Sequence, residues 1–176
     1  MLYPAAIAAA VGEHFGLSRE EIELGLTQFV PTRMRMNICK RGDGITILDD
    51  TYNANPQSMR AAISVLQDSR SKNKVAILGD MLELGPFSPA LHTGVGEYVG
   101  KTDIACLITI GPESAAMAQG ARDAGVPHVY HCADKEAAKV VLEKMIAPNT
   151  TYLLKASRGM HMEELTAYLM EQTKEG

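Results

Sequence analysis

Residues 47–59 read Ile-Leu-Asp-Asp-Thr-Tyr-Asn-Ala-Asn-Pro-Gln-Ser-Met, and this stretch indicates the fold class. Before it, residues 44–48 form an apolar, β-rich run that ends in two carboxylates. Pro56 suits the first position of a helix, and Asn55 can cap the free backbone N–H groups behind it. Apolar residues then recur at helical spacing over 59–66. The stretch therefore predicts a strand, a polar loop and a helix.

The polar loop is a candidate binding site. Asp49, Asp50, Asn53 and Asn55 follow the carboxyl end of a strand, which is where open α/β sheets bind ligands. The start of the following helix also attracts anions. The alternative is an ordinary Asn-Pro turn in which these side chains satisfy only local backbone groups. So many polar groups within seven residues favour a site.

The stretch stands between a predicted hairpin and a regular alternation of strands with helices. Residues 34–40 and 44–49 flank an Arg-Gly-Asp-Gly turn and predict a hairpin. Further strands are expected at 74–78, 106–110, 128–131 and 151–155, and helices at 56–69, 88–99, 113–124, 134–146 and 160–173. Such alternation predicts a Rossmann-like α/β fold, with a mostly parallel sheet covered by helices on both faces.

A short two-helix segment precedes the hairpin. The Ala-rich residues 3–14 predict one helix, and the capping pattern of Ser18 and Glu21 predicts a second that runs to about Phe29. The first helix presents small apolar side chains that need a close partner. We therefore expect residues 1–32 to be the tail of an upstream domain and residues 33–176 to form the α/β domain. If the partner is absent, the exposed face would promote self-association.

The composition excludes several classes of protein. The chain has 176 residues, 46% hydrophobic and 22% charged, with a net charge of −4 and scattered basic residues, so we expect no nucleic-acid partner. It lacks an apolar run of the roughly 18 to 20 residues that membrane insertion needs. Cys39, Cys106 and Cys132 are widely spaced and odd in number, which argues against a disulfide framework and indicates a cytoplasmic location.

Some sequence patterns resemble known binding motifs, but their context argues against these assignments. Gly-Lys-Thr at 100–102 matches the end of a P-loop motif but lacks the earlier glycine and falls near the end of a predicted helix. His128 and His131 would point to opposite faces of a strand, so we predict no metal site. His92 and His161 are expected at the surface or at helix caps.

Two later strands also end in polar runs, at the same edge of the predicted sheet. Residues 79–85 read Gly-Asp-Met-Leu-Glu-Leu-Gly, which is either a turn with a helix cap or a direct ligand contact. Residues 155–160 read Lys-Ala-Ser-Arg-Gly-Met and combine a hydroxyl with a guanidinium. Because arginine binds carboxylates through two parallel hydrogen bonds, Arg158 is a candidate carboxylate ligand.

Together these runs closely resemble the C-terminal domain of the ATP-dependent Mur ligases, in particular the branch that adds D-alanyl-D-alanine to UDP-N-acetylmuramoyl-tripeptide in peptidoglycan synthesis. Phe29, Pro31 and Arg35 stand in the order found at the domain junction of that family. Ala156 replaces a family glycine, so the local geometry at this position can differ.

The resemblance implies a reaction that uses ATP and Mg²⁺. The carboxylate of the UDP-linked tripeptide is phosphorylated, and the amine of the dipeptide attacks the acyl phosphate to form an amide. The P-loop and most metal ligands of this chemistry belong to upstream domains absent from this chain. We therefore expect no catalytic residue within the chain, which should be inactive alone.

Particular residues take roles by the same resemblance. Arg35 resembles the arginine that reaches the nucleotide phosphates after domain closure, and Asp50 resembles the aspartate that contacts the ATP ribose. Positioning, rather than proton transfer, is their expected role. The candidates for holding D-alanyl-D-alanine are Asn53, Asn55, Ser157 and Arg158, with Arg158 on its carboxylate.

Three alternatives remain at this point. A sibling Mur ligase would add a single amino acid in place of the dipeptide. A stand-alone Rossmann-like nucleotide-binding module would need a glycine-rich turn after its first parallel strand, and residues 49–56 contain no glycine. A non-catalytic interaction module would use the two N-terminal helices.

Overall fold

The computed structural model describes residues 2–30 and 32–172. The chain divides into two compact units, Met1–Thr32 and Arg33–Gly176. The predicted boundary after residue 32 coincides with this division. The assignment of the first unit to an upstream domain stays a prediction.

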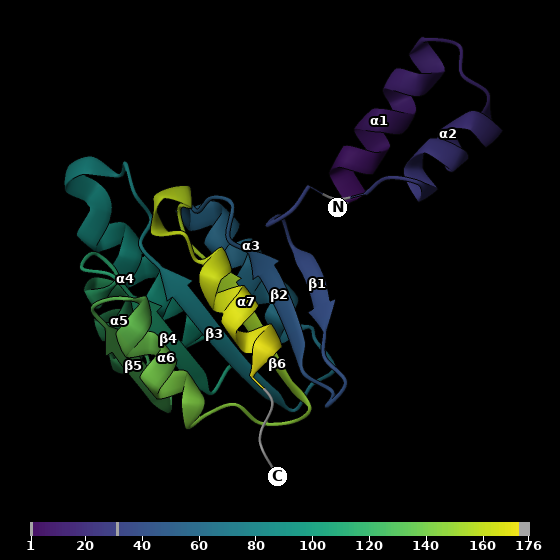
Figure 1. The fold of residues 1–176 in the computed structure, drawn as a ribbon. Coiled ribbons are helices and arrows are strands. Elements are labelled where there is room, and N and C mark those ends of the chain that lie inside the picture. The colour runs from purple at the N-terminus through teal and green to yellow at the C-terminus, as the bar shows by residue number, and fades with distance from the viewer. Residues whose placement is uncertain (1, 31, 173–176) are drawn as a thin grey trace. The chain divides into compact units, whose positions relative to one another are not determined.

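The first unit is a pair of helices, α1 (Leu2–His14) and α2 (Arg19–Thr27) (Figure 1). Ser18 caps α2 in the predicted way, because its side chain accepts from the Glu21 N–H while the Glu21 carboxylate accepts from the Ser18 N–H. Gly12 lets the helices approach closely, since a Cβ at this position would lie 2.9 Å from Ile22. α2 ends two residues before the predicted Phe29, which is within the usual scatter of helix ends.

The second unit is built on a six-stranded sheet in the order β1-β2-β6-β3-β4-β5. Its strands are β1 (Asn37–Lys40), β2 (Thr46–Asp50), β3 (Asn73–Gly79), β4 (Cys106–Ile110), β5 (His128–Cys132) and β6 (Thr150–Lys155). Only β1 pairs antiparallel, in the predicted hairpin with β2. Asp50 of β2 and Leu78 of β3 both pair with Lys155 of β6, so these three strands end at one level.

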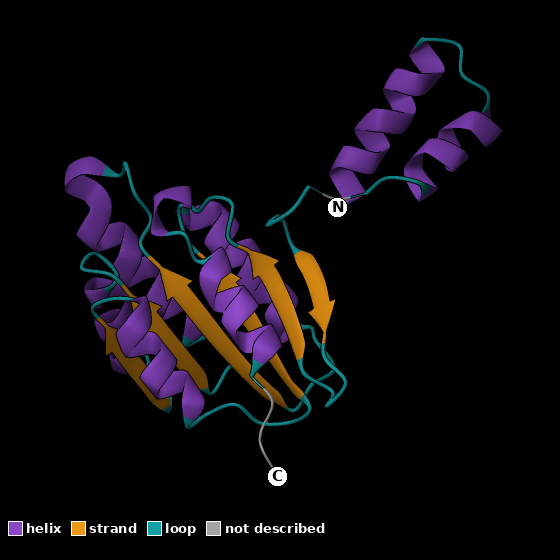
Figure 2. Ribbon diagram, viewed as in Figure 1, coloured by secondary structure: helices purple, strands orange, loops and turns teal. Residues whose placement is uncertain are grey.

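Helices cover both faces of the sheet, which confirms the Rossmann-like prediction (Figure 2). One apolar cluster packs the sheet against α3 (Pro56–Gln67), α4 (Ser88–Val99) and α5 (Ala115–Asp123). The other packs it against α6 (Lys135–Glu143) and α7 (Glu163–Glu171). The strands contribute to both clusters because successive side chains point to opposite faces of the sheet. In β3, Val75 and Ile77 belong to one cluster, and Ala76 and Leu78 belong to the other.

The prediction for the last helix is wrong at its start. A helix was expected from residue 160, but Arg158–Met160 form a single 3-10 turn and His161 has φ of 50°, in the left-handed region. This residue breaks the helical path, so α7 begins only at Glu163. The predicted end at residue 173 lies outside the described residues.

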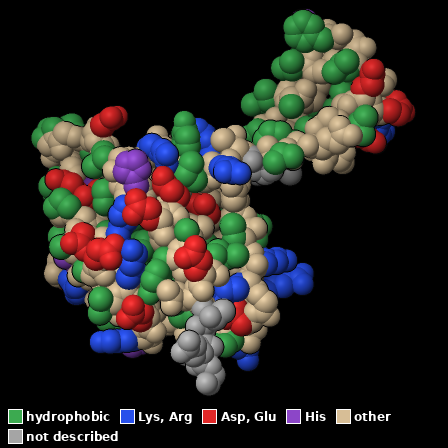
Figure 3. All heavy atoms as spheres, in the orientation of Figure 1, with side chains coloured by type: hydrophobic (Ala, Val, Ile, Leu, Met, Phe, Trp, Pro, Cys, Tyr) green, Lys and Arg blue, Asp and Glu red, His purple; other side chains and the backbone are tan. Residues whose placement is uncertain are grey.

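Every helix that the structure describes is too short or too polar to cross a membrane. Figure 3 shows acidic and basic side chains interspersed over the visible face of the second unit, and apolar side chains gathered on the two helices of the first.

Candidate functional site

Three loops meet where the central strands β2, β6 and β3 end. They are the β2 loop (51–55), the β3 loop (80–87) and the β6 loop (156–162), each named after the strand that it follows. The helices that follow β2 and β3 lie on one face of the sheet, and the helix that follows β6 lies on the other. The chain therefore leaves neighbouring strands in opposite directions, and a cleft opens between the loops. This cleft has a volume of about 300 Å³ and is lined by Tyr52, Asn53, Leu82, Glu83, Ser157, Arg158 and Gly159.

Lys155 joins the β6 end to the β2 loop. Its side chain is 2% exposed, and its Nζ lies 2.5 Å from Asp50 Oδ2 and 2.7 Å from the Asn53 carbonyl oxygen. The other Asp50 oxygen accepts from the Met36 N–H at 3.0 Å. Sequence reasoning gave Lys155 no role, although a lysine at the end of an apolar strand was a signal that it needs a buried partner.

The asparagines of the β2 loop make local hydrogen bonds. Asn53 Oδ1 accepts from the Ala54 N–H at 2.8 Å. Asn55 Oδ1 accepts from the Ser58 N–H at 2.8 Å, and Ser58 Oγ accepts from the Asn55 N–H, so Asn55 caps α3. Asn55 thus lies at the start of α3 rather than in the cleft, while Asn53, Ser157 and Arg158 line the cleft.

Ser157 joins the β6 loop to the β3 loop. Its N–H donates to the Asp80 carbonyl oxygen at 3.0 Å, and its Oγ accepts from the Leu82 N–H at 2.8 Å. Ala156, where the resemblance leads one to expect glycine, is fully buried beside Gly79. A Cβ on Gly79 would lie 2.7 Å from the Ala156 Cβ, so the extra methyl group fits because residue 79 is glycine.

His92 corrects a prediction. It was expected at the surface or at a helix cap, but it is fully buried within α4. Its Nε2 accepts from the Met81 N–H at 3.0 Å, and its Nδ1 lies 2.8 Å from the Ser88 carbonyl oxygen. The pattern assigns the ring proton to Nδ1, because only a donor suits a carbonyl. His92 therefore binds the β3 loop to α4 through the Met81 N–H. No local sequence signal indicates this role.

Arg158 is held at the cleft by Glu163. Its Nη1 lies 2.8 Å from Glu163 Oε1 and 3.2 Å from Met34 Sδ. Burial pushes the pKa of Glu163 upward, but its own backbone N–H and Arg158 outweigh this effect, so the pKa lies below its ordinary value. The guanidinium of Arg35 lies 4.3 Å from the ring centroid of Tyr52, a cation–π contact beside the cleft.

Within the described residues, no group of three or more His, Cys, Asp or Glu side chains could hold a metal ion. The Gly-Lys-Thr run at 100–102 follows the end of α4, as expected from the sequence, and does not link a strand to a helix start.

The strand order and the helices on both faces define a Rossmann-like α/β domain, with a cleft at the ends of its central strands. The chain belongs to the Mur ligase family: the family profile described as "Mur ligase, glutamate ligase domain" matches residues 34–158. It is 34% identical over 169 residues to the UDP-N-acetylmuramoyl-tripeptide--D-alanyl-D-alanine ligase of Bacillus subtilis, with 95% of this chain and 37% of that protein covered. The corresponding ligase of Escherichia coli is 35% identical, with 95% and 36% covered.

Solved structures agree with this assignment. A crystal structure of MurF from Acinetobacter baumannii superposes with a TM-score of 0.84 at 32% identity and covers 96% of this chain and 37% of that one. The chain thus spans a little over a third of the length of these relatives. The resemblance to the family that the three polar runs indicated is confirmed.

Proposed function

We propose that this chain supplies the C-terminal domain of a ligase that joins D-alanyl-D-alanine to UDP-N-acetylmuramoyl-tripeptide. The relatives named above carry this activity in their names. The observation that carries the proposal is the convergence of all three family runs on one cleft, with Asn53, Ser157 and Arg158 in its wall.

In this proposal the domain binds and orients rather than performs the chemistry. ATP with Mg²⁺, bound mainly by the rest of the enzyme, would convert the tripeptide carboxylate to an acyl phosphate, which the dipeptide amine attacks. Arg158 would bind the dipeptide carboxylate, and Asn53 and Ser157 would line its path. Asn55 would act by closing the β2 loop against α3. Holding the amine in line with the acyl phosphate lowers the entropic part of the barrier.

Arg35 and Asp50 would contact the nucleotide. Arg35 is exposed, and its side chain rests on Tyr52, so it can reach phosphates that approach from outside the domain. Asp50 keeps 18% of its side chain exposed although both of its oxygens have protein partners. A ribose hydroxyl could donate to that exposed part.

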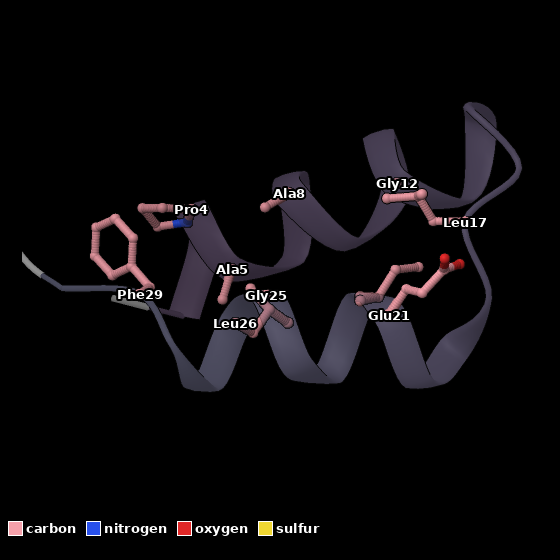
Figure 4. Close-up of a pocket in the computed structure, with 10 residues that line it drawn as sticks. Pro4, Ala5, Ala8, Gly12, Leu17, Glu21, Gly25, Leu26 and Phe29 are labelled. Carbon is pink, nitrogen blue, oxygen red and sulfur yellow. The ribbon is translucent and has the colours of Figure 1, made fainter.

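Residues 1–32 would be the helical tail of the preceding, central domain of the ligase. An apolar groove of about 420 Å³ runs between α1 and α2, lined among others by Ala5, Ala8 and Leu26 (Figure 4). Two helices of this size cannot enclose a core of their own. Their exposed apolar side chains therefore favour packing against another apolar surface. We propose that the remaining part of the enzyme supplies this surface.

A chimera tests the function. This chain would replace the aligned segment of the Bacillus subtilis ligase, and ATP-dependent amide formation would be measured with D-alanyl-D-alanine and with single amino acids. We expect activity with the dipeptide only. In the same chimera, Arg158→Ala should raise the KM for the dipeptide far more than the KM for ATP. A folded chimera that is inactive, or that accepts only single amino acids, would contradict the proposal.

A further inference from the structure

The cleft contains two opposite charges that do not neutralise each other. Glu83 and Arg158 both line it, yet Arg158 pairs with Glu163 at 2.8 Å. Glu83 makes no ion pair or side-chain hydrogen bond with any residue that the structure describes. A carboxylate without a protein partner among the described residues therefore shares a small cleft with a guanidinium that Glu163 holds.

Hydrogen bonds hold the backbone of the two loops that carry Glu83 and Arg158. The hydrogen bond from the Leu82 N–H to Ser157 Oγ ties the residue before Glu83 to the residue before Arg158. Glu83 itself has φ of 65°, in the left-handed region that non-glycine residues rarely occupy. Because His92 accepts from the Met81 N–H, the loop is also held two residues earlier. The backbone from which the Glu83 side chain extends is thus held by the fold.

We propose that Glu83 binds the amino group of the dipeptide whose carboxylate Arg158 binds. This inference rests on the proposed function and adds to it a residue and a selection rule. The cleft would accept a short peptide only if both its amino and its carboxyl ends are free. A carboxylate accepts N–H hydrogen bonds from an ammonium and, more weakly, from the neutral amine that remains once the ammonium has lost a proton to water. Only that neutral amine carries a lone pair to attack an acyl group, and Glu83 can hold the nitrogen in both protonation states.

The size and the wall of the cleft suit such a ligand. A volume of about 300 Å³ lies at the lower end of small-molecule sites. Tyr52 and Leu82 supply apolar surface, and both side chains are partly exposed at the cleft, at 38% and 41%. Two small methyl side chains can contact these walls while the charged ends of the peptide reach Glu83 and Arg158.

The test is a binding cycle on the isotope-labelled chain, followed by NMR. The ligands are D-alanyl-D-alanine, its N-acetyl derivative, its C-terminal amide, and L-alanyl-L-alanine as the stereochemical control. The proteins are the wild type, Glu83→Gln, and Glu97→Gln as a matched control. Glu97 is an exposed residue of α4 that does not line the cleft.

N-acetylation should weaken binding to the wild type by roughly 10- to 100-fold, as expected for loss of a charge-assisted hydrogen bond. Glu83→Gln should weaken binding of the unmodified dipeptide by a similar factor, while N-acetylation of the ligand should then add little. The C-terminal amide should bind weakly to the wild type and to Glu83→Gln alike. Glu97→Gln should behave as the wild type.

Any of three results would overturn the inference. The first is a wild-type chain that binds the N-acetyl derivative as well as the free dipeptide. The second is a Glu83→Gln chain that binds the free dipeptide normally. The third is a wild-type chain that shows no binding of the dipeptide. If the chimera is active in any of these cases, the proposed function stands and only the role of Glu83 fails. If the chimera is also inactive with the dipeptide, both proposals fail.

Discussion

At the scale of single residues, Lys155 shows how one buried charge organises a site. A lysine that is 2% exposed must find partners, because the free energy of removing an ammonium from water is large. Asp50 and the Asn53 carbonyl oxygen are those partners, and both belong to the β2 loop. The same contacts that satisfy the charge therefore hold the loop in the shape that forms one wall of the cleft.

Replacing Lys155 by methionine should lower the free energy of unfolding by about 3 kcal/mol, since it leaves the Asp50 carboxylate without its ion pair. Urea denaturation measures the change. Lys101→Met, at an exposed position, should stay within about 0.5 kcal/mol of the wild type. The double variant Lys155→Met with Asp50→Asn should recover part of the loss. A loss below about 1 kcal/mol in the single variant would show that the pair is not important for stability.

The pair of Glu163 and Arg158 should make stability depend on pH. The pKa of Glu163 is lowered from 4.5 in the folded state, so its stabilising effect is present above pH 4.5 and is lost as the pH falls through the lowered value. Glu163→Gln should therefore cost about 1 kcal/mol or less at pH 7, because the pair is partly exposed, and less than that near pH 3, where the carboxylate becomes protonated.

Denaturant titrations at the two pH values measure this difference. At pH 7, the loss of unfolding free energy caused by Glu163→Gln should be smaller in 1 M salt, since salt screens exposed ion pairs. An equal cost at both pH values would show that Glu163 acts by packing instead of by charge.

At the scale of elements, two helices begin with the same cap but differ in their position. Asn55 caps α3 and Asp134 caps α6, and in each case the side chain accepts from the backbone N–H three residues later at 2.8 Å. α3 follows the β2 loop of the cleft, whereas α6 follows β5 at the opposite edge of the sheet from β1. Variants of these two caps can therefore separate an effect on stability from an effect on ligand binding.

Asn55→Ala and Asp134→Ala should each lower the free energy of unfolding by about 1 kcal/mol, the usual value of such a cap. Only Asn55→Ala should weaken dipeptide binding, because only its cap closes the β2 loop. Asn55→Asp keeps an oxygen acceptor and should retain most of the stability. If the two alanine variants bind the dipeptide equally well, Asn55 is a structural cap without a role in the site.

At the scale of the whole molecule, the two units differ in how much apolar surface they enclose. The second unit has a buried cluster on each face of its sheet. In the first, no residue of α2 is buried, and Tyr3 and Phe15 are 84% and 78% exposed. Such surface favours association with another apolar surface in water.

A chain of residues 33–176 should therefore fold on its own, with one cooperative unfolding transition close in temperature to that of the full chain. It should remain monomeric over a range of concentrations at which residues 1–176 associate. Thermal unfolding and sedimentation velocity measure the two properties. Loss of cooperative unfolding, or association equal to that of the full chain, would show that the first unit is not the associating surface.

Local patterns were enough to predict most elements. α4 and β4 have the predicted bounds, because helical periodicity and a short apolar run are properties of neighbouring residues. The cap of α3 was also predicted, since Asn-Pro before an apolar helical pattern is a local signal. The start of α7 was not, because the left-handed conformation of His161 has no signature in its own residue type.

The sequence by itself determined the order of strands and helices, the family resemblance, and the three polar runs at strand ends. Only the tertiary structure decided which side chains share the cleft. His92 is buried next to the β3 loop, Lys155 bonds to the β2 loop, and Glu83 forms no ion pair with any residue that the structure describes. These relations join residues far apart in the chain. They depend on the pairing of β6 between β2 and β3, which no local pattern encodes.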